Sequence, residues 1–355
     1  MRWLLVVLLA ACGPRAAAPP PHPAAPRAPA SARSPHPDPH PRPDPDPDPH
    51  PHPDPGADPS PPPRKAPPDG LHVTGKRDTL SIEETWRNGQ LEGPRRIYRQ
   101  KVLVLEESYR GGGLDGDWIA YLTSGRPRAK GRYRQGKRDG TWTTWHSNGK
   151  MQSQGDYTDG LKNGWWVSYD RSGRELGRYE MNHGTGTELT WHRPGKLESE
   201  LEFVDGLRQG AYRRYSTSGK LVAEGTYQDG RREGAWIERF PDGKPRLQAS
   251  YRGDRLDGPY RRYHPKGTIA LEATYLRGLR DGRVVSRYAS GKPEREATYV
   301  GGKLDGEALE YHDNGKLAER SHWKSGMLDG IVEVFSPAGK LQSRATYRAG
   351  TLVKQ

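Results

Sequence analysis

The sequence predicts an all-β protein: an elongated single antiparallel ribbon of stacked β-hairpin repeats, preceded by a disordered Pro-rich stalk. Three observations predict this fold. One pattern of about 24 residues recurs eleven times after residue 79. Gly or Pro interrupts nearly every eight to ten residues of it, which excludes helical repeats. Only 32% of the residues are apolar, too few for one thick core, so the buried surface must be distributed over many small units.

Each unit contains one regularly spaced glycine, which we call the marker glycine. An aromatic residue stands seven places before every marker. Four places before it stands Gly in nine units, with Asn182 and Asp254 in the other two. Because Asn and Asp tolerate positive φ best among the other residues, this position is predicted to be left-handed. The markers are Gly93, Gly116, Gly140, Gly164, Gly186, Gly210, Gly234, Gly258, Gly282, Gly306 and Gly330.

Each unit is predicted to form one hairpin. In the unit that starts at Gly140, Trp142 and Trp145 lie on a first strand rich in aromatic residues. Residues 147–150 form the turn, with a glycine in its left-handed position. The second strand ends at the recurring aromatic Tyr157, and Gly155 stands two places before it. Residues two apart share a strand face, so this small residue is expected to leave room for a neighbouring ring.

Two units depart from the common spacing. One interval between markers is two residues short, and we place this deletion between Gly173 and Tyr179. Loss of two residues keeps every side chain on its own face, whereas loss of one would invert the strand. In the first unit Val102 stands where the turn glycine is expected, a degeneracy typical of the end units of repeat arrays.

These units resemble the MORN repeat variant family, whose pattern is Tyr-x-x-Gly-x-x-x-Gly-x-Trp-x-x-Tyr-x-x-x-Gly-Lys. Residues 157–174 follow the pattern with Arg in place of the final Lys, and residues 133–150 follow it with Trp145 for the second Tyr. The resemblance covers residues 79–350. It implies an antiparallel ribbon of hairpins and a role in membrane association, contact with anionic lipid or protein assembly. Some members of the family are labelled antitoxins.

Residues 1–11 are predicted to be a lipoprotein signal peptide. Arg2 precedes nine apolar residues, which are too few to span a bilayer. Residues 9–12 resemble the lipobox of bacterial lipoproteins, and Cys12 is the single cysteine of the chain. The resemblance implies that Cys12 carries acyl chains that hold the protein to the cell envelope. Gly13 stands where an Asp would resemble an inner-membrane retention signal, which favours the outer membrane.

Residues 12–70 are expected to form the disordered, lipid-anchored stalk, and residues 71–355 the repeat domain. Alternate prolines between residues 34 and 55 fix φ and remove amide donors, so neither helix nor sheet is expected there. The intervening His and Asp residues could bind Zn²⁺ or Cu²⁺. Polyproline II repeats every three residues, however, so ligands two apart point in different directions. We therefore predict a solvated spacer, and no metal or other cofactor.

The charge of the chain favours anionic partners. The formal net charge is +13, and all of the excess lies in residues 71–355. Two pairs of arginines, each between two tyrosines, are the candidate binding residues: Arg213, Arg214, Arg261 and Arg262. Such a surface can stack and pair with single-stranded nucleic acid, but export of a lipid-anchored protein argues against that partner. Anionic lipid, glycolipid or an acidic protein is favoured. In the alternative, these rings are the sheet's own packing and the arginines its solvated edge.

Catalysis is not predicted. Four histidines each lie six places after a marker, so they form one repeat column and are expected to be an exposed ladder: His146, His192, His264 and His312. No nucleophile elbow, phosphate-binding loop or zinc-protease motif occurs. We expect a non-enzymatic, membrane-anchored binding or scaffold lipoprotein. The alternative is an antitoxin or immunity-type protein that binds and neutralises a toxin, with a toxin or an envelope protein as partner.

Overall fold

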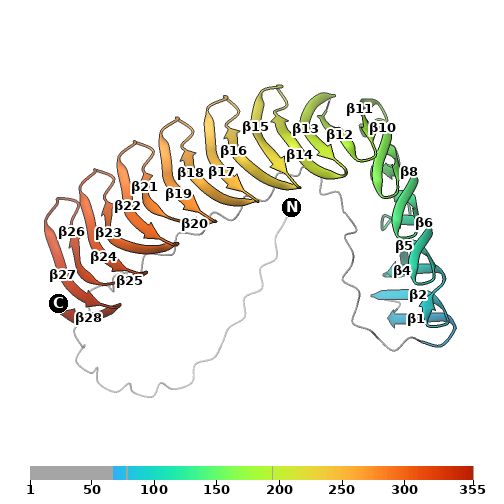
Figure 1. The fold of residues 1–355 in the computed structure, drawn as a ribbon, viewed down its shortest axis with the longest axis horizontal. Coiled ribbons are helices and arrows are strands. Elements are labelled where there is room, and N and C mark those ends of the chain that lie inside the picture. The colour runs from blue at the N-terminus through green and yellow to red at the C-terminus, as the bar shows by residue number, and fades with distance from the viewer. Residues whose placement is uncertain (1–66, 77–78, 194, 355) are drawn as a thin grey trace, which may run out of the picture. The chain divides into compact units, whose positions relative to one another are not determined.

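The computed structural model describes residues 67–76, 79–193 and 195–354. The predicted signal peptide, Cys12 and the stalk up to residue 66 lie outside the described residues. Within the described ranges the chain is all-β and contains no helix, and its 28 strands form one antiparallel open sheet (Figure 1). The predicted fold class is confirmed for the repeat domain.

The strands follow the hairpin period of the sequence. They are β1 (Gly70–Lys76), β2 (Leu80–Arg87), β3 (Gln90–Leu91), β4 (Gly93–Arg99), β5 (Val102–Arg110), β6 (Gly113–Tyr121), β7 (Pro127–Arg134), β8 (Lys137–Trp145), β9 (Met151–Thr158), β10 (Leu161–Tyr169), β11 (Glu175–Asn182), β12 (Thr185–His192), β13 (Lys196–Val204), β14 (Leu207–Tyr215), β15 (Leu221–Gln228), β16 (Arg231–Arg239), β17 (Pro245–Arg252), β18 (Arg255–Tyr263), β19 (Ile269–Leu276), β20 (Leu279–Arg280), β21 (Gly282–Arg287), β22 (Pro293–Val300), β23 (Lys303–Tyr311), β24 (Leu317–Lys324), β25 (Met327–Leu328), β26 (Gly330–Phe335), β27 (Leu341–Arg348) and β28 (Thr351–Lys354).

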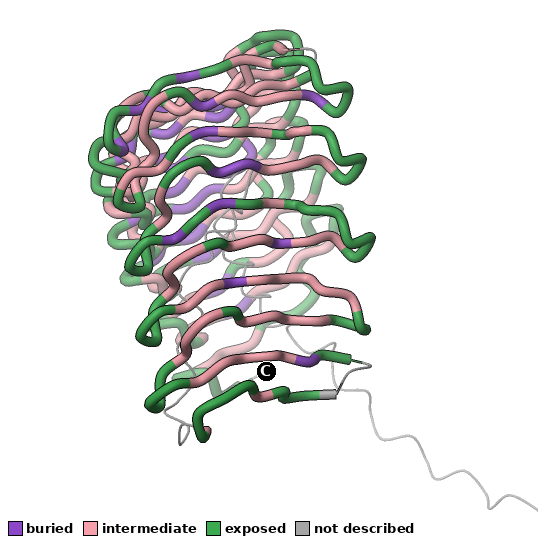
Figure 2. The backbone as a smooth tube through the Cα atoms, turned by 90° about the vertical axis from the view of Figure 1, so that its right-hand side faces the viewer, coloured by how far each residue is buried: buried purple, intermediate pink, exposed green. Residues whose placement is uncertain are grey.

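Consecutive strands pair along the chain, so the sheet is a continuous meander (Figure 2). The short strands β3, β20 and β25 pair with the same neighbours as β4, β21 and β26, which directly follow them. Each of these pairs is therefore one strand that is interrupted near the marker glycine.

Two kinds of turn alternate, and each kind occupies its own edge of the ribbon. At the long-turn edge, residues 146–150 connect β8 to β9, and Gly149 adopts φ 85°. At the short-turn edge, Asp159 and Gly160 connect β9 to β10 with φ 51° and 88°. Positive φ at both central residues suits the twist of a two-residue hairpin. The predicted left-handed position is confirmed at Gly160 and also at Asp254, where φ is 67°.

The core is a ladder of aromatic rings on one face of the sheet. Tyr133 and Trp142 have ring centroids 5.3 Å apart, Trp142 and Tyr157 6.0 Å, and Tyr157 and Trp166 5.1 Å, all edge to face. Edge-to-face contact places the positive ring edge against a negative ring face. Trp236, in a later unit, is only 2% exposed. Because the rings bury one another, this face has a core without a second layer of described residues over it.

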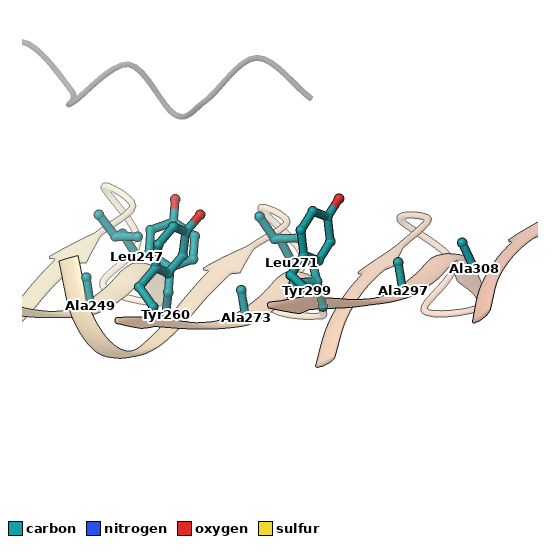
Figure 3. Packing of buried hydrophobic residues seen from close by; sticks show 10 residues of the cluster. Leu247, Ala249, Tyr260, Leu271, Ala273, Ala297, Tyr299 and Ala308 are labelled. Atoms are coloured by element: carbon teal, nitrogen blue, oxygen red, sulfur yellow. The ribbon is translucent and has the colours of Figure 1, made fainter. Parts of the chain in front are cut away.

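In most units a small residue stands beside the ring, and its size matches the size of that ring. A Cβ atom at Gly131, Gly155 or Gly225 would come within about 2 Å of the Trp ring of the next hairpin. Where the ring is smaller, the position holds Ala: Ala249 pairs with Tyr260. Figure 3 shows Ala249, Ala273 and Ala297 on the same side of the sheet as Tyr260 and Tyr299. The predicted role of the small residue is confirmed.

The position predicted for the two-residue deletion is wrong. Marker Gly140 pairs with the recurring aromatic Tyr157, but Gly164 pairs with Met181, and Tyr179 pairs with Trp166. Met181, 3% exposed, therefore replaces the recurring aromatic in this unit. The missing residues lie after the short turn, where only Thr185 separates the turn glycine from the marker. The two-residue length still keeps every side chain on its own face.

The same shift overturns the prediction for Asn182. This residue ends β11 in an extended conformation, and the turn consists of His183 and Gly184, with φ 45° and 80°. As a result β11 and β12 are joined by two residue pairs only, Met181 with Gly186 and Asn182 with Thr185. The equivalent ladder between β9 and β10 has five. The sheet thus has a weak seam between β11 and β12.

The first unit does without a turn glycine because its turn is shorter. Gln100 and Lys101 connect β4 to β5, and both have positive φ, 50° and 67°. Val102 is already the first residue of β5 and pairs with Arg99. This turn has the two-residue geometry that usually favours Asn-Gly, so the end unit closes with a strained but compact hairpin.

Filling the space beside a tryptophan should destabilise the sheet. We expect Gly225→Ala to lower the free energy of unfolding by about 1–3 kcal/mol, because the new methyl group overlaps the ring of Trp236. Adding Trp236→Tyr should recover part of the loss, since Ala beside Tyr is the combination found at Ala249 and Tyr260. Denaturant unfolding of the two single variants and the double variant measures this coupling. Strictly additive losses would contradict it.

Restoring the missing residues should close the seam. Inserting Lys-Asn after Thr185 gives this unit the three-residue spacing that follows Gly160. We expect the β11–β12 ladder to lengthen, and the β11 amides that face β12 to exchange with solvent roughly tenfold more slowly. Hydrogen exchange followed by mass spectrometry measures this. The same insertion after Ser172, in a long turn, is the control. Equal exchange in both insertions would show that the spacing does not cause the seam.

Candidate binding surfaces

Basic side chains lie over the aromatic ladder. The position two places before the marker holds Arg or Lys in five units: Arg138, Lys162, Arg208, Arg232 and Arg280. The guanidinium of Arg138 lies 4.7 Å from the Trp142 ring centroid, and that of Arg232 lies 4.2 Å from the Tyr251 ring. These are cation–π distances. The five cations therefore cover the rings of their own sheet and contribute to its packing.

The opposite face carries ion pairs between neighbouring strands. Arg96 Nε lies 2.8 Å from Glu106, and Arg261 Nε lies 2.8 Å from Glu272. Tyrosines join these pairs: the Tyr215 hydroxyl donates to Glu200 over 3.1 Å. Because the pairs are partly exposed, each contributes only a few tenths of a kcal/mol up to about 1 kcal/mol. We call this surface the ionic face.

The four predicted binding arginines do not form one patch. Neighbours along a strand point to opposite faces. Arg213 and Arg261 lie on the ionic face, paired with Glu200 at 3.5 Å and Glu272 at 2.8 Å. Arg214 and Arg262 lie on the aromatic face. Arg214 is half-buried and Arg262 is exposed. Three strands, β15 to β17, separate the two pairs in the sheet.

A buried polar cluster joins three strands at the seam. Lys162 of β10 lies 2.9 Å from the Glu188 carboxylate of β12, and its ammonium donates to the Tyr179 hydroxyl of β11 over 3.0 Å. Burial alone would lower the pKa of Lys162, but the Glu188 carboxylate reverses this, and the pKa is raised. Burial raises the pKa of Tyr179. The cluster clamps the three strands where their backbone ladder is shortest.

The histidine column is structural and half-buried, so the expected exposed ladder is wrong. Nε2 of His146 lies 2.9 Å from the carbonyl oxygen of Tyr169, one unit further along the chain. A carbonyl oxygen only accepts, so Nε2 must carry the hydrogen. His192, His264 and His312 make the same bond to the next unit, at 2.8 to 3.0 Å. These side chains tie consecutive hairpins together at the long-turn edge.

One column of polar residues was missed from the sequence. The residue directly before the marker is Asp or Glu in eight of eleven units. In six of these units it accepts a hydrogen bond from an amide of the next unit's short turn. Asp281 accepts from the Gly301 amide at 3.0 Å, and Asp305 accepts from the Ser325 amide at 3.1 Å. The 24-residue recurrence of acids was the signal that could have revealed this role.

Neither a metal-binding cluster nor a membrane-spanning helix is found among the described residues. Within residues 67–76, 79–193 and 195–354, no group of three or more His, Cys, Asp or Glu side chains could hold a metal ion. No helix in that part of the chain is long and apolar enough to cross a membrane. Cys12 and the His- and Asp-rich stretch of the stalk lie outside the described residues.

The fold and these surfaces define a repeat protein with one open antiparallel sheet, in which every hairpin presents the same positions to solvent. The family model of the MORN repeat variant matches five segments, residues 138–159, 208–229, 256–276, 304–325 and 328–349. The chain therefore contains MORN-variant repeats, as its sequence pattern indicated, and such repeats suggest a repeat-based binding or scaffold protein. No curated protein sequence matches it.

Removing one charge of the seam cluster should destabilise the fold. We expect Glu188→Gln to lower the free energy of unfolding by about 3–5 kcal/mol, because the buried Lys162 ammonium loses its counter-charge. Glu175→Gln removes the exposed pair with Arg178 and should cost less than about 1 kcal/mol. Chemical denaturation at pH 7 compares the two variants. If both variants lose the same free energy of unfolding, the cluster around Lys162 does not hold the three strands together.

The same cluster should make stability depend on alkaline pH. The folded pKa of Lys162 lies above its ordinary value of 10.5, so the contribution of the pair is complete below that pH and declines as pH rises through the folded pKa. The raised pKa of Tyr179 acts in the same direction. Stability measured between pH 8 and about 11 should therefore fall less steeply in Glu188→Gln than in the wild-type protein.

Proposed function

We propose that this chain is a non-enzymatic lipoprotein, anchored in the cell envelope, that presents its MORN-variant repeats to anionic partners. The observation that carries the proposal is the charge distribution. The whole excess of +13 belongs to residues 71–355, and basic side chains recur at fixed positions of the unit. A surface repeated many times binds by multivalency, so weak individual contacts add to a high avidity.

The anchor rests on the N-terminal sequence. Residues 9–12 resemble a lipobox, Cys12 is the single cysteine, and Gly13 favours the outer membrane. Two or more acyl chains hold a protein to a membrane, whereas one chain binds only marginally. In this proposal the stalk separates the repeats from the anchoring bilayer. The partner is anionic lipid or glycolipid, and the compartment argues against nucleic acid.

A protein partner is the alternative, and one observation favours it. Aliphatic side chains are exposed beside the short turns of neighbouring units near the C-terminal end of the sheet: Leu276 is 52% exposed, Val300 59% and Met327 49%. Exposed apolar groups rimmed by polar residues are typical of protein interfaces. An antitoxin or immunity-type protein that binds a toxin, or a scaffold for an envelope protein, would use such a surface.

Membrane binding by the repeats should be electrostatic. The full chain carrying Cys12→Ala, which removes the anchor, should bind vesicles that contain anionic lipid and not zwitterionic ones. The binding should weaken with salt, because exposed charges are screened over about 10 Å at 0.1 M. Replacing the four candidate arginines by Gln should weaken it about thirtyfold, since each basic residue near an anionic surface contributes on the order of 1 kcal/mol and only the two arginines of one face can lie against a flat membrane. Vesicle co-sedimentation measures both effects.

Two controls separate charge and anchor from fold. Replacing the same four arginines by Lys keeps the charge, so it should leave vesicle binding nearly unchanged. A fatty-acid analogue should label the wild-type protein and not the Cys12→Ala variant. If the protein binds neutral vesicles as well as anionic ones, the protein partner is favoured. If the fatty-acid analogue labels the Cys12→Ala variant, the lipobox assignment is wrong.

A further inference from the structure

We infer that the long-turn edge of the ribbon is a binding site for a linear anionic polysaccharide. The inference deepens the proposed function, on which it rests for the compartment, and assigns the anionic partner to one edge of the sheet. The four arginines predicted from the sequence lie elsewhere, on the two faces.

The long turns are strongly basic. Across the ten long turns, the residues six to ten places after the marker include twelve Lys or Arg against three Asp. In nine of the ten, a basic residue directly follows the turn glycine: Arg126, Lys150, Arg174, Lys196, Lys220, Lys244, Lys292, Lys316 and Lys340. All nine are exposed. In the tenth turn Lys266 directly precedes the glycine and is also exposed.

The short-turn edge has no such excess. We counted the two residues of each short turn, the residue on either side of them, and the residue directly before each marker. Over all short turns these positions hold eleven basic and twelve acidic side chains. Six of the eight acids before the markers accept from the turn amides, as Asp281 does from Gly301. These acids balance the basic side chains at the short-turn edge, whereas the long-turn edge has few acids. The two edges therefore differ in net charge.

Four of the basic side chains at the long-turn edge are held in place. The stems of Lys150, Lys244, Lys292 and Lys316 lie over the turn glycine of the next unit: a Cβ at Gly173 would stand 3.6 Å from Cδ of Lys150, and one at Gly339 would stand 3.5 Å from Cδ of Lys316. The Lys316 ammonium donates to the carbonyl of Ala338 over 2.8 Å. An ammonium has three hydrogens, so others remain for a ligand, and an ordered side chain loses less entropy on binding.

The spacing of this row favours a linear polymer. Each unit adds two strands, so successive cations are about 10 Å apart along the edge. Sheets twist by roughly 20–25° per strand, so the row winds about the ribbon, and a flexible chain can follow it further than a flat membrane can. Phosphates of polyphosphate are separated by a single bridging oxygen, much closer than the cations. The charges of an anionic polysaccharide are separated by one or two sugar rings, which suits the row better.

The test compares two sets of four neutralised residues in the full chain carrying Cys12→Ala. The edge set is Lys150→Gln, Lys220→Gln, Lys292→Gln and Lys316→Gln, which keeps most of each stem and an N–H donor. The control set lies at the short-turn edge and removes the same charge: Arg87→Gln, Arg110→Gln, Lys303→Gln and Lys324→Gln. The probe is polygalacturonate, a linear polymer with one carboxylate per sugar, and binding is followed by titration calorimetry at several salt concentrations.

We expect the edge set to weaken polygalacturonate binding about tenfold and to reduce its salt dependence, because four ionic contacts are lost. The control set should change binding less than about twofold. Equal weakening by both sets would overturn the inference, since net charge alone would then explain binding. Tighter binding of polyphosphate than of polygalacturonate would also overturn it. If the protein binds anionic vesicles and not polygalacturonate, this inference falls while the proposed function stands.

Discussion

The contact between a large ring and a small residue on the adjacent strand determines the rest of this structure. Within the described residues no second layer covers the aromatic face, so the rings have to bury one another. Trp166 achieves this by lying over Gly155, where even a methyl group would overlap the ring. The size of one residue therefore sets the size allowed at its neighbour, and units that hold Ala at this position carry a smaller partner such as Tyr260.

This local contact is extended by bonds that join each hairpin to the next. His146 reaches the carbonyl of Tyr169 at one edge, and Asp281 holds the amide of Gly301 at the other. Each bond connects residues 20 to 23 positions apart, close to one repeat. Stability in such a ribbon is a sum of units and of nearest-neighbour interfaces. The same columns that give the sequence its period therefore hold its hairpins in order.

The period, the hairpins and the small-residue column could be predicted because they depend on residue types at fixed intervals. The register of the short unit could not. Tyr179 matches the aromatic column by type, but strand pairing gives that column to Met181, and pairing is a property of two segments. The surfaces were predicted less well for a related reason. Arg213 and Arg214 are adjacent in sequence, yet strand alternation places them on opposite faces.

The seam between β11 and β12 gives the ribbon an internal boundary. Most neighbouring strands are joined by four or more residue pairs, but here two residue pairs and the cluster around Lys162 carry the connection. In a chain of nearest-neighbour interfaces, the weakest one limits how far order propagates. The hairpins before and after the seam are therefore expected to unfold as two cooperative blocks, although they share one sheet.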